Sequence, residues 1–169
     1  MSSPKRRSYE AETELANLLW KLGFAVIRGP ASGGGARKRF QPDLVAVKEG
    51  RVLVLEIKRF FREEGPLYLE SSQVMRLQEW ARRAGGTALI AVRLSGGEWR
   101  IHNINDLKVT KGGNFKLDDP KKGLRLRDFL EIFESRSRPL TEYMDFGKQR
   151  DILCLLDSRK ICHKRFRIW

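Results

Sequence analysis

With 169 residues and 41% hydrophobic content, the chain is long enough for the core of one domain, and no apolar stretch approaches the ~18 residues of a membrane-spanning helix. Lysine and arginine number 34 against 21 acidic residues, so the net charge of +13 favours a polyanion as partner, with nucleic acid ahead of a membrane surface. Two cysteines are too few for the disulfide framework of a secreted domain, which indicates a reduced, cytoplasmic compartment.

The first predicted element is an amphipathic helix over residues 8–22, with Ser8 as its N-cap and Gly23 as its end. Its apolar stripe consists of Leu15, Leu18, Leu19 and Leu22. A strand is predicted over residues 24–28. Residues 29–41 contain Ser32, a glycine run and three consecutive basic residues, so we expect a mobile cationic loop there.

The rest of the chain begins with a β-hairpin over residues 44–57, because two leucine-rich and β-branched runs flank Glu49-Gly50. The later elements are predicted as a short strand or loop at 66–69, a helix from 71 or 72 to 84 that stops at Gly85, strands at 88–94 and 99–104, and an irregular segment at 106–123. An amphipathic helix at 124–134 follows, with Leu126, Phe129, Leu130 and Phe133 facing inward. They form one domain over residues 1–138. A basic tail of unknown role follows over 139–169, with a short helix near 148–156, and it is either a DNA-contacting arm or a solvated terminus.

The predicted hairpin brings charged residues together. If Glu49-Gly50 makes a two-residue turn, the antiparallel ladder places Asp43 opposite Glu56. Strand alternation then puts Lys58 on the same face as Glu56. Opposed carboxylates repel unless a cation compensates, and Mg²⁺ prefers one or two carboxylates together with waters and phosphate oxygens. The pattern therefore predicts a Mg²⁺ site at which the Lys58 ammonium orients a water or offsets negative charge.

A simpler reading of these residues stays open, in which Asp43 caps the strand while Glu56 and Lys58 face solvent. Residues 52–57 are apolar on both faces, however, and a buried glutamate needs a partner. Glu12 lies at the border of the first helix's stripe and is the helix acid best placed to face the sheet, with a solvated side chain as the alternative. Ser32 could hold a phosphate oxygen or could be an ordinary turn serine.

Basic residues form two clusters, one before the first helix and one after the glycine run. We expect phosphate contacts from Lys5, Arg6, Arg7, Arg28, Arg37, Lys38 and Arg39, with a merely cationic surface as the alternative. Motifs of other hydrolases are missing from the sequence: it has no G-x-x-x-x-G-K-[ST], no G-x-S-x-G and no H-E-x-x-H. ATP hydrolysis and serine or zinc hydrolysis are therefore disfavoured.

Pro42-Asp43 followed by Glu56-Ile57-Lys58 has the form of the PD-(D/E)xK nuclease signature. Together with Glu12, the run GFAVIRGPASG at 23–33 and residues 73–86, it resembles the archaeal Holliday junction resolvases of the Hjc type. The resemblance covers about residues 6–134. It implies an α/β protein with a mixed central β-sheet flanked by helices, in a restriction-endonuclease-like nuclease fold.

The resemblance also implies an activity and its residues. Members are homodimers that bind four-way DNA junctions and nick two opposed strands symmetrically with Mg²⁺, for which Mn²⁺ is a plausible substitute, so a nucleoid-associated protein is expected. Lys58 matches the catalytic lysine and Ser32 the serine of the mobile loop. The implied metal ligands are Asp43, Glu56, Glu12 and the main-chain carbonyl of Ile57.

One position departs from the family pattern. Relatives often have a small hydroxyl residue after the lysine, whereas this chain has Arg59-Phe60-Phe61, which leaves metal use intact and the local DNA contacts open. The alternative functions are another PD-(D/E)xK endonuclease acting on DNA or RNA, or a non-catalytic architectural DNA-binding protein.

Overall fold

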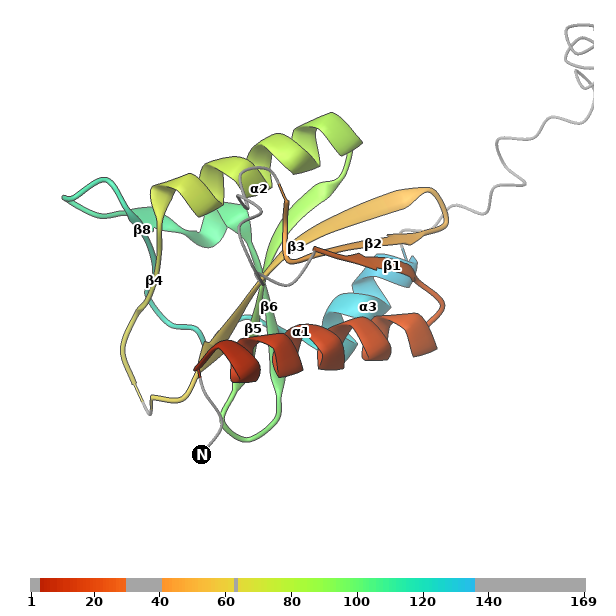
Figure 1. Ribbon diagram of the computed structural model, residues 1–169, viewed down its shortest axis with the longest axis horizontal. Helices are drawn as coiled ribbons and strands as arrows, with labels where there is room; N and C mark the ends of the chain where they lie inside the picture. The colour runs from red at the N-terminus through yellow and green to blue at the C-terminus, as the bar shows by residue number, and fades with distance from the viewer. Residues whose placement is uncertain (1–3, 30–40, 63, 136–169) are drawn as a thin grey trace, which may run out of the picture. The chain divides into compact units, whose positions relative to one another are not determined.

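The computed structural model describes residues 4–29, 41–62 and 64–135, all within a compact unit that spans residues 1–135 (Figure 1). The elements are α1 (Pro4–Lys21), β1 (Ala25–Arg28), β2 (Leu44–Lys48), β3 (Arg51–Phe60), β4 (Leu67–Leu69), α2 (Ser71–Ala84), β5 (Thr87–Leu94), β6 (Trp99–Asn103), η1 (Ile104–Asp106), β7 (Lys108–Val109), β8 (Phe115–Leu117), β9 (Leu124–Arg125) and α3 (Leu126–Ser135). No helix in the described ranges is both long and apolar enough to span a bilayer.

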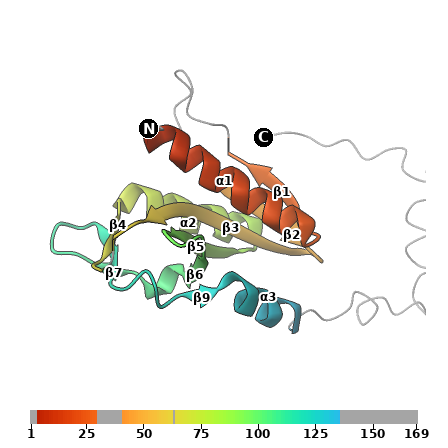
Figure 2. The same cartoon turned by 90° about the horizontal axis from the view of Figure 1, so that it is seen from below.

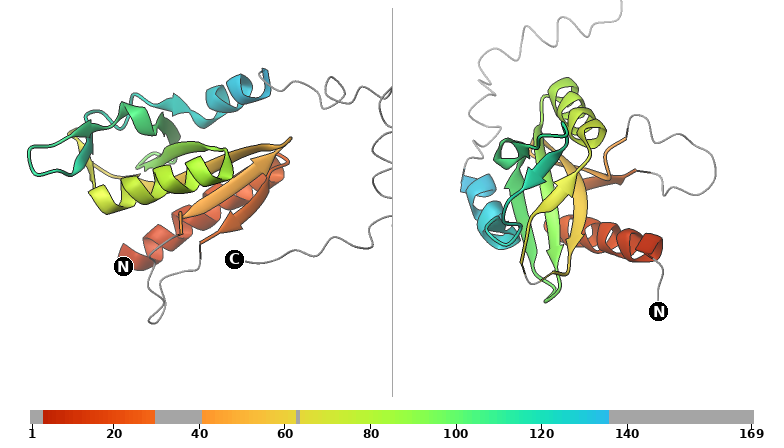
Figure 3. Two further views of the ribbon diagram at one scale, coloured as in Figure 1. Left: turned by 90° about the horizontal axis from the view of Figure 1, so that it is seen from above. Right: turned by 90° about the vertical axis from the view of Figure 1, so that its left-hand side faces the viewer.

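The main sheet has six strands in the order β1-β2-β3-β5-β6-β9, and a smaller sheet has the order β4-β8-β7. β3 runs antiparallel to β2 and parallel to β5, so the main sheet is mixed. Figure 1 shows α2 on one side of this sheet and α1 and α3 on the other. Figure 2 shows α1 beside β1 and β2 and α3 beside β9, and the left view of Figure 3 shows α2 in front of the strands. The predicted fold class, a mixed sheet flanked by helices, is confirmed.

The β2–β3 hairpin has the predicted register, because Lys48 pairs with Arg51 and Leu44 with Leu55. Glu49 and Gly50 both have positive φ, 52° and 71°, as a type I′ turn requires. Farther along, α2 ends at Gly85 in the left-handed conformation, which confirms the predicted stop.

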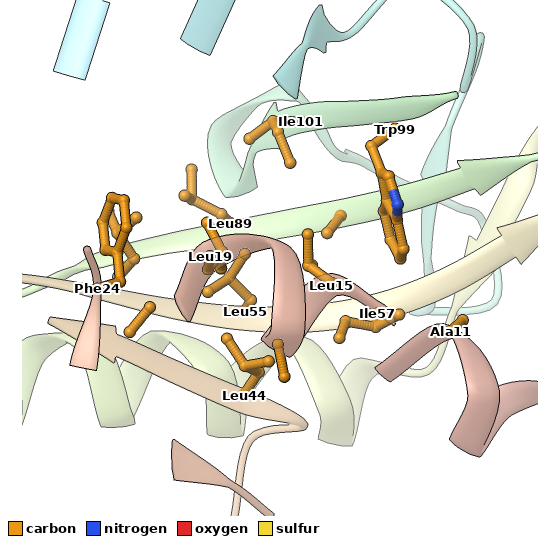
Figure 4. Packing of buried hydrophobic residues seen from close by; sticks show 14 of the residues in the cluster. Ala11, Leu15, Leu19, Phe24, Leu44, Leu55, Ile57, Leu89, Trp99 and Ile101 are labelled. Atoms are coloured by element: carbon orange, nitrogen blue, oxygen red, sulfur yellow. The ribbon is translucent and has the colours of Figure 1, made fainter. Parts of the chain in front are cut away.

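β3 is the central strand of the fold because both of its faces are covered. Leu53, Leu55 and Ile57 pack with residues of α1 and α3, whereas Val54 and Phe60 pack with residues of α2. Figure 4 shows Leu15 and Leu19 of α1 in the first of these clusters, beside Leu55. Burial on both faces explains why the sequence of β3 is a nearly continuous apolar run.

The last helix packs as the sequence predicts. Phe133 of α3 is buried, and its ring centroid lies 5.2 Å from that of Phe24. Leu126, Phe129 and Leu130 pack against the same cluster.

Two predictions about elements are wrong. α1 begins at Pro4, so Ser8 is an internal helix residue whose hydroxyl donates to Glu12 Oε1 at 3.4 Å. A proline is well tolerated in the first turn, and the basic residues after it are good helix formers. The segment 106–123, expected to be irregular, contains β7 and β8, which pair with each other while β8 also pairs with β4. Residues 30–40 of the loop predicted at 29–41, the boundary after residue 138 and the predicted tail helix lie outside the described residues.

Candidate active site

Asp43 lies just before β2, between the end of β1 and the middle of β3. Its Oδ2 accepts a hydrogen bond from the Ile57 amide at 2.8 Å, and its main-chain carbonyl accepts one from the Gly29 amide at 3.0 Å. A Cβ atom on Gly29 would lie 2.5 Å from the Pro42 carbonyl oxygen, so only glycine permits this approach of the two backbones. The main chain of Asp43 is thus held from the end of β1, and its carboxylate is held from β3.

Glu56 lies in the middle of β3 and is only 8% exposed. Its Oε1 accepts hydrogen bonds from Lys58 Nζ at 2.8 Å and from Gln73 Nε2 at 3.2 Å. A carboxylate buried to this extent requires a charged or hydrogen-bonding partner, and Lys58 provides the charge. Strand alternation explains the contact, because Glu56 and Lys58 are two residues apart on β3 and project from the same face.

Asp43 and Glu56 also share a face. The ladder between β2 and β3 pairs Leu44 with Leu55, and both of these leucines belong to the core under α1. One residue farther along each strand, Asp43 and Glu56 therefore project toward the opposite face, on the side of α2. The structure thus brings Asp43, Glu56 and Lys58 to one place on the sheet, as the hairpin register indicates.

Gln73 is a member of this cluster that the sequence analysis did not assign to the site. It is in the first turn of α2, and its Oε1 lies within hydrogen-bonding distance of Lys58 Nζ, at 3.3 Å. One indication of this was present in the sequence, because Gln73 lies in the first turn of the helix that follows the strand of Glu56 and Lys58. The sequence does not show which face of the sheet that helix covers, so the contact could not be predicted.

Glu12 has a different environment. Its Oε2 lies 3.1 Å from Arg28 Nη2, and the Arg28 guanidinium stacks on the Tyr9 ring at 4.4 Å from the centroid. Burial lowers the pKa of Arg28, but hydrogen bonds to Tyr9 and Glu12 outweigh that effect and leave the pKa raised. Arg28 pairs with Leu44 in the ladder, so this ion pair belongs to the α1 side of the sheet.

The oxygen ligands available for a divalent cation therefore come mainly from two carboxylates. Among the described residues, no group of three His, Cys, Asp or Glu side chains is arranged to hold a metal ion. Asp43 and Glu56 suit Mg²⁺, which takes one or two carboxylates and keeps several waters. Ile57, whose amide binds Asp43, is the residue between Glu56 and Lys58 and could add its carbonyl oxygen.

The predicted DNA-binding residues are only partly within the described chain. Arg6 and Arg7 are exposed on α1, where Arg6 pairs with Glu10 at 3.2 Å and the Arg7 carbonyl accepts a bond from Arg59 Nη1 at 2.8 Å. Arg59 also stacks on Phe61, so the unusual residues after Lys58 tie β3 to the start of α1. The remaining candidates, Ser32, Arg37, Lys38, Arg39 and the side chain of Lys5, lie outside what the structure describes.

Comparison with known proteins gives a consistent result. The family model described as archaeal Holliday junction resolvase (Hjc) matches residues 3–138. The crossover junction endodeoxyribonuclease Hjc of Sulfurisphaera tokodaii is 36% identical over 148 residues, which is 85% of this chain and all of that protein. The Sulfolobus acidocaldarius Hjc is 30% identical over 146 residues, covering 84% of this chain and 99% of the relative. The solved structure of Archaeoglobus fulgidus Hjc, a Holliday junction resolvase, matches with a TM-score of 0.61 and 35% identity, over 72% of this chain and 98% of that one.

Proposed function

The chain belongs to the family of archaeal Holliday junction resolvases, and from this premise we propose that it is a Mg²⁺-dependent, structure-selective endonuclease that resolves four-way DNA junctions. The observation that carries the proposal is the cluster on the α2 side of the sheet, where Asp43 is fixed by the Ile57 amide and the buried Glu56 contacts Lys58. These residues coincide with the signature motif of the family's nuclease superfamily. The reaction is hydrolysis of one phosphodiester bond in each of two opposed strands.

In this proposal the two carboxylates and the lysine have separate tasks. Asp43 and Glu56 would hold Mg²⁺, with the Ile57 carbonyl as a further ligand and Mn²⁺ as a substitute. Glu12, expected from the sequence as another ligand, instead pairs with Arg28 on the α1 side of the sheet. The bound cation would polarise the scissile phosphate and lower the pKa of a water. The Lys58 ammonium, which lies 2.8 Å from Glu56 Oε1, would orient that water and offset the negative charge that develops on the phosphate.

We further propose that the protein acts as a homodimer on branched DNA, because a two-fold axis presents two equal sites to two equivalent strands. The packing of α2 supports a dimer. This helix contacts mainly β3 and β5, so it leaves its side of β1 and β2 largely uncovered. On that side the pairs Ala25–Val47 and Ile27–Val45 bring four apolar side chains together, and Ile27 is 71% exposed. An apolar patch of this kind favours contact with a second copy.

Recognition of the junction would rest on phosphate contacts and shape more than on base edges. We assign the phosphate contacts to Arg28, to the exposed Arg6 and Arg7 with Lys5 beside them, and to the basic cluster Arg37 to Arg39. A protein with this substrate would be nucleoid-associated in the cytoplasm.

A cleavage assay tests the proposal. Purified protein is incubated with a labelled four-way junction, a matched linear duplex and a single-stranded RNA, each with Mg²⁺ or with EDTA. Paired nicks restricted to the junction and abolished by EDTA are the expected result. Cutting of duplex or RNA would instead identify another nuclease, and junction binding without cutting would identify an architectural protein.

The control for the site assignment is Asp43→Asn. Its neutral side chain keeps the length and the acceptor for the Ile57 amide but loses the charge that holds a cation. Cleavage should be lost while junction binding is retained, and unchanged cleavage in this variant would contradict the assignment.

A further inference from the structure

We propose that Gln73 is a positioning residue of the nuclease site, which holds the Lys58 ammonium and the Glu56 carboxylate in a fixed arrangement. The inference rests on the proposed function and deepens it. It starts from the fact that one side-chain amide reaches both residues, with Nε2 donating to Glu56 Oε1 at 3.2 Å and Oε1 accepting from Lys58 Nζ at 3.3 Å.

A primary amide is suited to this place because it carries two donors and an acceptor in one plane. Its NH₂ group faces the anion and its oxygen faces the cation, and the reversed orientation would set donor against donor and acceptor against acceptor. The charges of Glu56 and Lys58 therefore select one orientation of the amide, which in turn restricts both of their side chains. Glutamate at this position would repel Glu56, and lysine would repel Lys58.

The backbone of Gln73 is itself well anchored. Gln73 lies in the first turn of α2, directly before Val74, which is buried in the core on that side of the sheet. The amide of Ser71, the first residue of α2, donates to Asn114 Oδ1 at 3.2 Å, which ties the start of the helix to the β7–β8 hairpin. The side-chain amide of Gln73 thus reaches the site from α2, an anchored helix outside the sheet that carries Glu56 and Lys58.

Positioning matters here because Lys58 has a flexible four-carbon stem and is bound only at its end. Held by Glu56 alone, the ammonium has one partner, and any motion of Glu56 moves it as well. Gln73 adds a second point of attachment for each group. The expected consequence of its loss is a slower chemical step with unchanged affinity for DNA.

A competing role for Gln73 is purely structural. Its Oε1 also lies 3.4 Å from the Glu70 amide, as in a capping box at the start of α2. Loss of a cap lowers the melting temperature but leaves the rate of cleavage by the folded protein unchanged. The two roles therefore differ in what they predict.

The test compares Gln73→Met with Gln78→Met, an identical change on an exposed position of the same helix. Methionine keeps the length of glutamine and its helix propensity but removes the amide. We expect Gln73→Met to reduce the single-turnover rate of junction cleavage on the order of 10- to 100-fold, with the Kd for the junction in EDTA changed less than about twofold. Gln78→Met should leave both values and the melting temperature as in the wild type.

Other outcomes would overturn the inference. An unchanged cleavage rate in Gln73→Met would do so, and so would a loss of junction binding or of folding in that variant, because both indicate a structural role. If the wild-type protein cleaves no junction, the proposed function fails instead.

A second measurement needs neither metal nor activity. In ¹H–¹⁵N spectra of the metal-free protein, Glu56→Gln should shift the side-chain NH₂ signals of Gln73 and leave those of Gln78 in place. Unmoved Gln73 signals would show that the contact with Glu56 is not formed, which would contradict the inference independently of any nuclease assay.

Discussion

The two faces of β3 differ sharply over the same few residues. On the α1 side, Leu53, Leu55 and Ile57 are buried in an apolar cluster. On the α2 side, Glu56 and Lys58 are joined by an ion pair and by the amide of Gln73. Strand alternation alone separates the two sets, which are interleaved residue by residue.

A small domain can thus place a buried carboxylate on one strand without weakening its core. The apolar face contributes burial, while the polar residues contact one another close to solvent, since Lys58 remains 23% exposed. We therefore expect substitutions of the polar residues Glu56 and Lys58 to reduce activity and substitutions of the buried apolar residues of β3 to reduce stability.

Lys58→Met should give the largest effect. Removal of the ammonium should lower the cleavage rate on the order of 10²-fold or more. The free energy of unfolding should fall by only about 1 kcal/mol, because the pair is partly exposed and Gln73 still donates to Glu56. Single-turnover cleavage and thermal unfolding measure the two quantities, with Lys21→Met on the exposed end of α1 as the control. A large loss of stability in Lys58→Met would contradict the expectation that this residue serves activity more than stability.

Leu55→Ala should have the opposite profile. Leu55 is 2% exposed in the core, so the truncation should lower the free energy of unfolding by about 2–5 kcal/mol. The matched change Leu22→Ala, at a leucine 43% exposed, should cost much less. Denaturant unfolding tests both variants. If Leu55→Ala reduced the cleavage rate of the folded protein as strongly as Lys58→Met, the two faces would not be functionally separate.

Gly29→Ala should affect both properties, because the added methyl group would push against the Pro42 carbonyl next to Asp43. We expect a loss of about 1–3 kcal/mol in unfolding free energy together with a reduced cleavage rate. Ala31→Gly, which removes a methyl group two residues farther along the chain, is a control for general effects of such a change. Wild-type values for Gly29→Ala would show that the strand ends adjust without moving Asp43.

The smallest effect is expected from Asp118, an exposed residue that serves as a reference for charges away from both faces. Hydrogen bonds from Lys108 and Lys116 lower its pKa from 3.8 to about 2. Since the folded-state pKa is depressed, its contribution to stability is present above pH 3.8 and is lost as the pH falls toward about 2. Melting temperatures of wild type and Asp118→Asn should therefore converge over that window, and a constant difference would contradict this.

The sequence was most informative where contacts are local. The Glu49-Gly50 turn fixed the register of β2 and β3, and the register in turn put Asp43, Glu56 and Lys58 on one face. The apolar spacing in α3 and the glycine stop after α2 likewise predicted the two helices to within a few residues.

Prediction failed where partners are distant in the sequence or signals conflict. β7 and β8 have two and three residues, and β8 pairs with β4 about fifty residues earlier, so nothing local marks them. Ser8 is a good cap residue in isolation, but the helix formers before it extend α1 to Pro4. Gln73 was missed because its contacts with Glu56 and Lys58 depend on which face of the sheet α2 covers.

Separation along the chain has a consequence for how the protein folds. The hydrogen bonds that join Asp43, Ile57, Glu56, Lys58 and Gln73 span only 2 to 17 residues. The bonds that join Glu14 of α1 to Arg93 of β5 and Glu134 of α3 to Lys48 of β2 span 79 and 86 residues, whereas the pair of Glu12 and Arg28 between α1 and β1 spans only 16. Closing the longer loops costs more chain entropy, so the cluster of Asp43, Glu56, Lys58 and Gln73 should assemble early around the hairpin and α2, with α3 and the contact of α1 to β5 forming afterwards.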